Sequence, residues 1–212
     1  MSFSNSALAI ALLLAGLVAW SFGEYVLHRF VMHEMRGRGM PSREHLVHHA
    51  DPERNIGRPV LSWIGIAVVG AVLFLAPGLF LLGPSTGWAT YAGWLLGYGI
   101  YQQIHNRAHS HGPRTAYGVC VRRNHFFHHH GHPMLNHGVT SPVWDKVFGT
   151  YAEAGRLRIP RRHAPNWLLD GDGKVRPEHA AYYEVVGSAD PSDRMAAIDR
   201  ARAFANLTLV AG

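Results

Sequence analysis

Ten of the sixteen histidines fall into four tight clusters along the chain. The clusters are His28-x4-His33, His45-x2-His48-His49, His105-x3-His109 and His125-x2-His128-His129. Neutral imidazole is a good ligand for iron, zinc and copper. Ten imidazoles are too many for one metal ion and suit two. Because a close pair of metal ions can share electrons and oxygen atoms, we expect a two-metal centre capable of oxidising an unactivated C–H bond.

The spacing within three of these clusters predicts that their histidines share one face of a helix. Residues three or four apart on an α-helix lie on the same face, so each of these clusters could direct two or three imidazoles at a single point. His28 and His33 are five residues apart, which is about 140° around an ideal helix. We therefore expect them either to flank a metal pair or to lie on a helix that is distorted near His33.

Other polar residues near the clusters are weaker candidates. Glu24 precedes His28 by four residues and could accept the free N–H of that imidazole, and Asp145 is a similar candidate; either could equally be a solvated residue. His163 and His179 are interpreted as ordinary surface residues. Four further histidines lie outside the repeated spacing and are expected to contact the ligands or solvent: His111, His130, His132 and His137.

Charge is strongly segregated along the chain. Residues 1–23 and 59–106 contain no Asp, Glu, Lys or Arg, and a charge in hydrocarbon is costly. We expect three membrane spans, at about 4–23, 60–82 and 88–106, with a kink at Pro77. Small residues at every fourth position from Ala7 to Gly23, and the Gly93-x3-Gly97 pattern, predict close helix packing.

The basic residues predict the orientation of these spans. Arginines are concentrated in the 24–58 loop and after the third span, so both regions are expected in the cytoplasm. All four histidine clusters then lie at the same membrane face. The net charge of +6 would face anionic lipid headgroups. The basic residues form no long run and no stripe with aromatics, which argues against nucleic-acid binding.

Several other chemistries are excluded by missing motifs. Cys120 is the single cysteine, so no intrachain disulfide and no cysteine-ligated iron–sulfur or zinc site can form. The sequence contains no CxxCH haem attachment signal, no G-x-S-x-G elbow and no phosphate-binding glycine-rich loop. Residues 1–150 are expected to form the membrane-embedded catalytic domain, and 151–212 a cytosolic tail. Asp190 and Pro191 predict the start of an amphipathic helix that runs to about Leu207 and packs on the core.

The clusters resemble those of the fatty acid hydroxylase / sterol desaturase superfamily of membrane diiron enzymes. The resemblance covers about residues 20–151. It rests on Glu24-Tyr25-x2-His28-Arg29-x3-His33, on the three later clusters, and on the stretch from Asn136 through Ser141-Pro142-x-Trp144-Asp145 to Thr150. It implies an all-α fold, an integral membrane helical bundle with a cytosolic helical cap holding a dinuclear metal site. The family's metal ligands carry over to the ten clustered histidines: His28, His33, His45, His48, His49, His105, His109, His125, His128 and His129.

The resemblance also implies the cofactors and partners of a lipid-modifying enzyme. These are two iron ions, for which zinc can substitute, O2 as co-substrate, and a lipid in the bilayer. The 212 residues include no cytochrome-b-type domain, so we expect electrons from a separate cytochrome-b-type or ferredoxin-type protein. Better-known members have four membrane helices, whereas three spans are expected here.

Within the superfamily the histidine spacing favours a fatty acyl or sphingolipid hydroxylase. A sterol or acyl desaturase or a carotenoid hydroxylase could use the same site, and a membrane metal-binding protein is the non-enzyme alternative. A metal transporter would be expected to place ligands near the middle of its spans, but residues 60–104 contain no His, Asp or Glu. The compact size favours a bacterial inner membrane, or the endoplasmic reticulum if the source is eukaryotic.

Overall fold

The computed structural model describes residues 3–53, 59–188 and 192–209. The chain divides into two compact units, each built from two separate stretches of sequence. The first unit comprises residues 1–24 and 58–103, and the second comprises 25–57 and 104–212. The second unit contains all ten clustered histidines.

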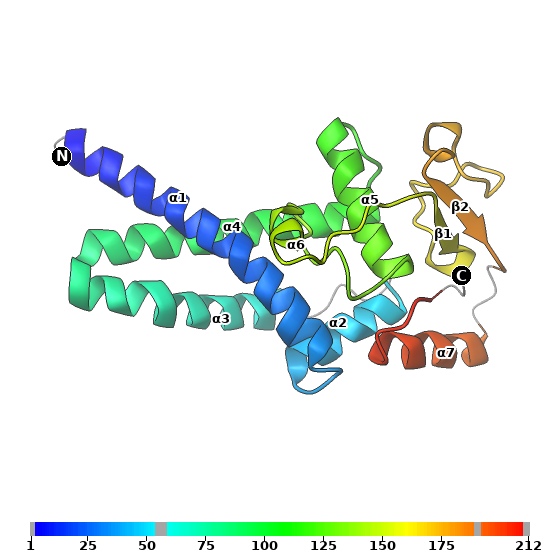
Figure 1. The fold of residues 1–212 in the computed structure, drawn as a ribbon, viewed down its shortest axis with the longest axis horizontal. Coiled ribbons are helices and arrows are strands. Elements are labelled where there is room, and N and C mark those ends of the chain that lie inside the picture. Colours follow the sequence, from blue (N-terminus) through cyan, green and yellow to red (C-terminus); the bar gives the residue numbers. More distant parts are fainter. Residues whose placement is uncertain (1–2, 54–58, 189–191, 210–212) are drawn as a thin grey trace. The chain divides into compact units, whose positions relative to one another are not determined.

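The first unit consists of long helices (Figure 1). Its elements are α1 (Phe3–Val26), α3 (Pro59–Gly70), the π-helical segments η2 (Ala71–Leu75) and η3 (Gly78–Leu82), and most of α4 (Pro84–Ser110). Pro77, where a kink is predicted, lies between η2 and η3. Since proline donates no backbone hydrogen bond, α-helical bonding is interrupted there. A tight turn at Gly83, whose φ is 95°, joins η3 to α4.

Glycines allow α1 and α4 to approach closely. A Cβ atom added at Gly16 would lie 2.1 Å from the carbonyl oxygen of Thr90, and one at Gly93 would lie 2.1 Å from that of Leu13. A Cβ at Gly97 would lie 2.5 Å from that of Trp20. The Gly93-x3-Gly97 pattern therefore does mark a close contact, as predicted.

The contact face of α1 differs from the predicted stripe of small residues. Ala7 and Ala11 are exposed, whereas Gly16 and Trp20 are buried. Trp94 of α4 fills the centre of this unit, with its ring centroid 5.0 Å from that of Trp20. The packing face of α1 is therefore determined by large aromatic side chains. The face predicted from the alanine spacing is wrong for the N-terminal half of the helix.

Two helical stretches are long and apolar enough to cross a membrane: Ser6–Glu34 and Pro59–Leu82. Large apolar side chains on them, such as Val18, Val60 and Phe80, are exposed. Such surfaces suggest a membrane protein, since lipid would cover them. Among the described helices α4 is also long, but its stretch is not apolar enough to meet the same criterion. The third span therefore stays a prediction.

The second unit is mostly helical but also contains a small sheet. Its elements are η1 (Leu27–Glu34), α2 (Met40–Ala50), the end of α4, α5 (Ala116–His130), α6 (Val143–Val147), β1 (Leu157–Pro160), η4 (Arg161–His163), η5 (Pro177–His179), β2 (Tyr183–Val186) and α7 (Asp193–Phe204). Strands β1 and β2 pair in parallel, with Leu157 opposite Tyr183. The expectation of an all-α fold is therefore wrong for the tail.

The sheet packs against the helix that carries three of the clustered histidines. Phe126 of α5 forms a buried cluster with Leu157, Ile159, Leu168 and Tyr183. All but Phe126 come from the tail after residue 150. The tail thus supplies most of the apolar core that supports α5.

Helix α7 forms where an amphipathic helix is predicted and packs on α2. The predicted start at Asp190 and Pro191 lies outside the described residues. The residue that caps the helix is Ser192, whose Oγ accepts a hydrogen bond from the Met195 amide at 3.4 Å. The helix ends at Phe204 rather than near Leu207.

The close approach of α1 and α4 leads to a stability prediction. Gly16→Ala should destabilise the protein by about 1–3 kcal/mol, because the added methyl group meets backbone atoms that cannot move aside alone. Among the residues that the structure describes, none has an atom near a Cβ added at Gly65 of α3 (within 4 Å), so Gly65→Ala should instead stabilise its helix by about 1 kcal/mol. Thermal unfolding of the detergent-solubilised variants measures both effects. An unchanged Gly16→Ala protein would contradict the close approach.

Candidate metal centre

The ten clustered histidines form two groups of five in the second unit. In each group the potential ligand nitrogens lie within 4.8 Å of one another, and every residue is buried. The first, which we call the η1 group, contains His28, His33, His45, His49 and His128. The second, which we call the α4 group, contains His48, His105, His109, His125 and His129. All ten predicted residues are therefore brought together, five to a group.

A change of helix type places His28 and His33, which are five residues apart, on the same face of the helix. Both lie on η1, an eight-residue π-helix that continues α1. Hydrogen bonds in a π-helix run from residue i to i+5, so residues five apart occupy neighbouring turns on one face. The ring centroids of His28 and His33 lie 5.2 Å apart. Of the two expectations for this pair, a distorted helix is the one observed.

The two HxxHH clusters are each divided between the groups. On α2, His45 and His49 face the η1 group while His48 faces the α4 group. On α5, His128 faces the η1 group while its neighbour His129 faces the α4 group. Two imidazoles of each cluster therefore converge, His45 with His49 and His125 with His129, as expected, while the third belongs to the other group. These two helices run between the groups and contribute to both.

The groups adjoin each other. The rings of His49 and His129, one from each group, stack with centroids 4.1 Å apart and planes only 8° from parallel. Neighbouring residues on α2, such as His48 and His49, also point to different groups. Two metal ions bound at these positions would be close neighbours.

Hydrogen bonds fix which ring nitrogen faces the centre of the η1 group. His33 Nδ1 lies 2.9 Å from Asn206 Oδ1, His128 Nδ1 lies 2.8 Å from the Leu135 carbonyl oxygen, and His28 Nδ1 contacts the His137 carbonyl oxygen. Oxygen acceptors require a proton on each Nδ1, so each Nε2 carries a lone pair.

These lone pairs face one another. The Nε2 atoms of His33 and His128 are 2.9 Å apart, those of His33 and His45 are 2.9 Å apart, and those of His28 and His45 are 3.0 Å apart. With no proton on His33 or His128 Nε2, their approach is repulsive unless a cation lies between them. Two nitrogens bound at right angles to a metal at about 2.1 Å would be about 3.0 Å apart. The η1 group therefore fits a metal ion.

The α4 group shows the same features. The Nε2 atoms of His109 and His125 lie 2.9 Å apart. His129 is buried, and within the described part of the chain neither of its ring nitrogens has a hydrogen-bond partner; the same holds for Nε2 of His49 in the η1 group. Buried polar atoms are rarely left without a partner. Both histidine groups could therefore hold metal ions.

Burial keeps these imidazoles in the form that binds metal. It lowers the pKa of His45, His49, His125 and His128 well below the usual value, and neighbouring histidines lower it further. Burial also lowers the pKa of His109 to about 3. At neutral pH these side chains are uncharged, so their lone pairs are available to a cation.

A buried carboxylate organises the segment whose carbonyl contacts His28. Asp145 accepts hydrogen bonds from the amides of His137 at 2.8 Å and Gly138 at 2.7 Å, and from Thr150 Oγ1 at 2.7 Å. A Cβ at Gly138 would lie 2.1 Å from the Ser141 carbonyl oxygen, so only glycine fits there. Asp145 thus orders the turn, and its Oδ1 also lies 3.6 Å from Nδ1 of His137, which is not one of the ten clustered histidines. Glu24, predicted to accept from His28, is buried, but His28 Nδ1 is directed at His137 instead.

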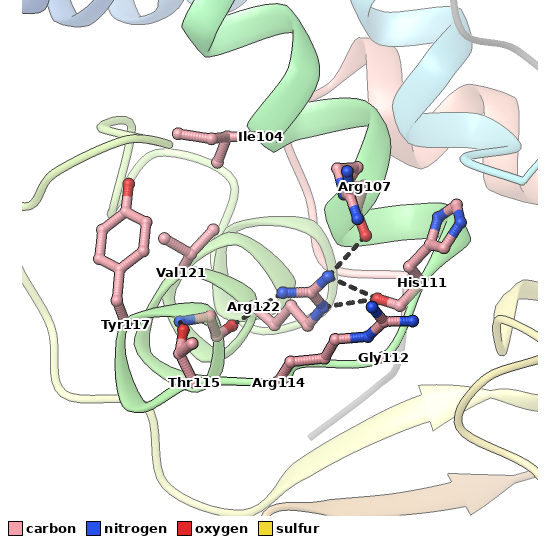
Figure 2. A pocket seen from close by; sticks show the side chains of 10 residues that line it. Ile104, Arg107, His111, Gly112, Arg114, Thr115, Tyr117, Val121 and Arg122 are labelled. Atoms are coloured by element: carbon pink, nitrogen blue, oxygen red, sulfur yellow. Dashed lines mark hydrogen bonds between the residues drawn. The ribbon is translucent and has the colours of Figure 1, made fainter.

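Arg122 joins α5 to the end of α4. Its guanidinium donates to the carbonyl oxygens of His111 at 2.8 Å, Arg107 at 2.7 Å and Gly118 at 3.0 Å (Figure 2). The first two carbonyls lie at the C-terminal end of α4, where the last carbonyls have no partner within the helix and a cation is favoured. Burial lowers the pKa of Arg122, and nearby Arg107 lowers it further. This contact connects the helix carrying His105 and His109 to the one carrying three other histidines.

The four histidines outside the repeated spacing lie as predicted, beside the groups or at the surface. His130 and His137 are buried beside the groups, while His111 and His132 are exposed. His163 is also buried, with Nε2 2.9 Å from Asp199 Oδ2. Its interpretation as a surface residue is therefore wrong.

The part of the chain that contains this site matches a known protein family. A model of the family described as fatty acid hydroxylase matches residues 13–150. The chain belongs to this family. The match covers all ten clustered histidines and ends where the tail begins.

Individual members of the family are similar over the same region. A dihydroceramide fatty acyl 2-hydroxylase from Arabidopsis thaliana is 31% identical over 142 residues, which are 64% of this chain and 58% of the relative. A fatty acid 2-hydroxylase from Mus musculus is 30% identical over 66% of this chain and 39% of its own length. A ceramide very long chain fatty acid hydroxylase from Saccharomyces cerevisiae is 30% identical over 69% of this chain and 39% of its own length. The chain thus spans between 39% and 58% of these relatives.

A solved structure has the same fold over the matched part. It is described as full-length scs7p with only the hydroxylase domain visible. Its TM-score is 0.58 at 30% identity, covering 68% of this chain and 56% of that one.

Sequence reasoning missed three residues that support the two groups. Arg122 and Trp167, whose Nε1 donates to the His109 carbonyl oxygen at 3.0 Å, both bind the end of α4. Asn206 contacts His33 from the far end of the chain. None belongs to a recognisable motif, because each acts on a partner that only the fold brings near.

The contact between α5 and α4 can be tested by removing Arg122. Arg122→Ala should lower the free energy of unfolding by on the order of 3 kcal/mol, because buried carbonyls lose charged donors. Arg114→Ala, at an exposed arginine lining the same pocket, should change it by about 0.5 kcal/mol or less. Chemical denaturation followed by tryptophan fluorescence would compare them. Equal stabilities would rule out a structural role for Arg122.

Proposed function

We propose that this chain is a membrane-bound diiron oxygenase that inserts one oxygen atom into a C–H bond of a lipid. The observation that carries the proposal is the pair of adjoining groups, each with five buried histidines whose lone pairs converge. The ten histidines of the η1 and α4 groups would hold two iron ions, for which zinc could substitute. With iron bound, the centre would supply activation of O2 for C–H oxidation.

The overall reaction needs an outside source of electrons. One C–H bond, one O2 molecule, two electrons and two protons give one C–OH group and one water. We propose that a separate cytochrome-b-type or ferredoxin-type protein delivers the two electrons. No side chain of the chain needs to act as a nucleophile.

The chain's own residues would shape the reactivity of the centre. The donor set is uncharged, so it does not cancel the metals' positive charge and leaves them electrophilic. Burial excludes bulk water, and the oxygen acceptors on His28, His33 and His128 hold these rings in one orientation. An oxidising centre at this site would therefore be shielded from solvent and would react with a C–H bond of the bound lipid.

The substrate is proposed to be a fatty acyl chain, favoured as part of a sphingolipid. This rests on the names of the relatives, which act on fatty acids, dihydroceramide or ceramide. Those named 2-hydroxylases place the new hydroxyl at carbon 2 of the acyl chain. The apolar helices Ser6–Glu34 and Pro59–Leu82 would place the protein in the same bilayer as such a lipid. The metal centre is proposed to face the cytoplasm.

Metal content tests the division of the α2 cluster. His45→Ala and His48→Ala alter residues three apart on one helix, but they belong to different groups. Each should reduce tightly bound metal from two ions per chain toward one, and the double variant should approach none. Arg43→Ala, at an exposed position on the same helix, should retain both. Elemental analysis of purified protein measures the ratio, and loss of both metals from each single variant would contradict two separate groups.

The proposed activity is tested by lipid mass spectrometry on cells that express the protein together with a competent reductase. Lipids gaining one oxygen are expected with the wild type and should be absent with His128→Ala at equal protein level. His132→Ala, at an exposed histidine outside both groups, should behave as wild type. Products lacking two hydrogens would instead show a desaturase. Identical lipids from all three cultures would refute oxygenase activity.

A further inference from the structure

The tail beyond the family match reaches into the η1 group. Asn206 lies 56 residues past the end of the matched segment at residue 150. Its Oδ1 accepts from His33 Nδ1 at 2.9 Å, and its Nδ2 donates to the His33 carbonyl oxygen at 3.2 Å. One amide side chain thus holds both the ring and the backbone of a single histidine, 173 residues away.

The backbone at Asn206 is shaped to make this contact. Its φ is +56°, the left-handed conformation that commonly ends a helix. Its amide donates to the Ala203 carbonyl oxygen at 3.0 Å, and that of Leu207 donates to Arg202 at 2.9 Å, which closes the end of α7. Glycine and asparagine are the residues that favour this conformation. Of the two, asparagine alone brings a side chain that can reach His33.

Helix α7 is fixed at several points, so Asn206 has a defined position. The Phe204 ring lies against Gly37, where an added Cβ would be 2.6 Å away. Gly37 lies three residues after the end of η1 and has a φ of +83°. Within α7, buried Asp199 accepts hydrogen bonds from Arg162 and His163 of the tail. The end of α7 is therefore held beside the π-helix that carries His33.

We propose that Asn206 is a positioning residue for the metal bound by the η1 group. An acceptor at Nδ1 keeps the His33 proton there, which leaves Nε2 free to bind a cation and sets the angle of the ring. Without Asn206 the proton could move to Nε2, the nitrogen that must be unprotonated for binding. This inference rests on metal binding by the ten histidines, as proposed above.

The experiment separates this contact from the stability of the helix end. Asn206→Gly keeps the left-handed backbone but removes both hydrogen bonds to His33. Asn206→Asp keeps an acceptor for Nδ1 and serves as the conservative rescue. Arg202→Ala removes the hydrogen bond from Arg202 to the Leu209 carbonyl oxygen at 2.8 Å, and so disturbs the tail without touching His33. For each protein, cobalt(II) titration gives the affinity, the number of ions and the visible absorption, and thermal unfolding is measured without metal.

Asn206→Gly should bind one cobalt ion as the wild type does and the second about 10–100-fold more weakly. Its unfolding midpoint without metal should lie close to that of Arg202→Ala, since each variant loses hydrogen bonds made by the tail. Asn206→Asp and Arg202→Ala should bind both ions with near wild-type affinity. Wild-type affinity for both ions in Asn206→Gly would overturn the positioning role, as would an equal weakening in Arg202→Ala. A wild-type chain that binds no metal would instead overturn the proposed function itself.

Discussion

The converging lone pairs of buried, neutral imidazoles are the constraint on which the rest of the second unit depends. Each buried polar nitrogen without a partner costs about 1–3 kcal/mol, and facing lone pairs add repulsion. The same arrangement becomes favourable when a cation lies between them, because each nitrogen then gains a strong partner. In such a site, metal-binding free energy contributes directly to folding. The surrounding elements must hold the rings in place despite that repulsion.

The structure holds the rings in place through hydrogen bonds at Nδ1, the ring nitrogen that points away from the centre of the group. Carbonyl oxygens of Leu135 and His137 accept from His128 and His28, and both lie in the segment between α5 and α6. Asp145 orders that segment through two backbone amides. The π-helix contributes in a different way. Its backbone hydrogen bonds follow the less common i to i+5 pattern, which places residues five apart on one face. Such segments are frequently found at functional sites.

Much of this centre could be predicted from spacing alone, and the limits of that prediction have physical causes. Eight of the ten histidines were identified because i, i+3 and i+4 intervals follow from helix geometry, whereas His28 and His33, five residues apart, needed the π-helix that the structure shows. The division of His45, His48 and His49 was missed because a shared face spans a wide angle, and only the neighbouring helices decide which group each ring joins. Asn206 was missed because its partner is remote in sequence. The sheet was missed because strands of four residues carry little periodicity.

Division of the HxxHH clusters has a mechanical consequence for the two histidine groups. On α2 and α5 the ligands of the two groups alternate within a single turn, so each helix is one rigid body shared by both groups. A shift of either helix must move ligands in both groups together. The separation of the groups is therefore set by helix geometry, with about 1.5 Å of rise per residue, and not by loops. Such an arrangement would keep two bound metal ions at a constant distance, which two-metal chemistry requires. Two elements, η1 and the end of α4, carry histidines of one group only, and additional contacts occur at both. Asn206 contacts η1, and Arg122 and Trp167 contact the end of α4.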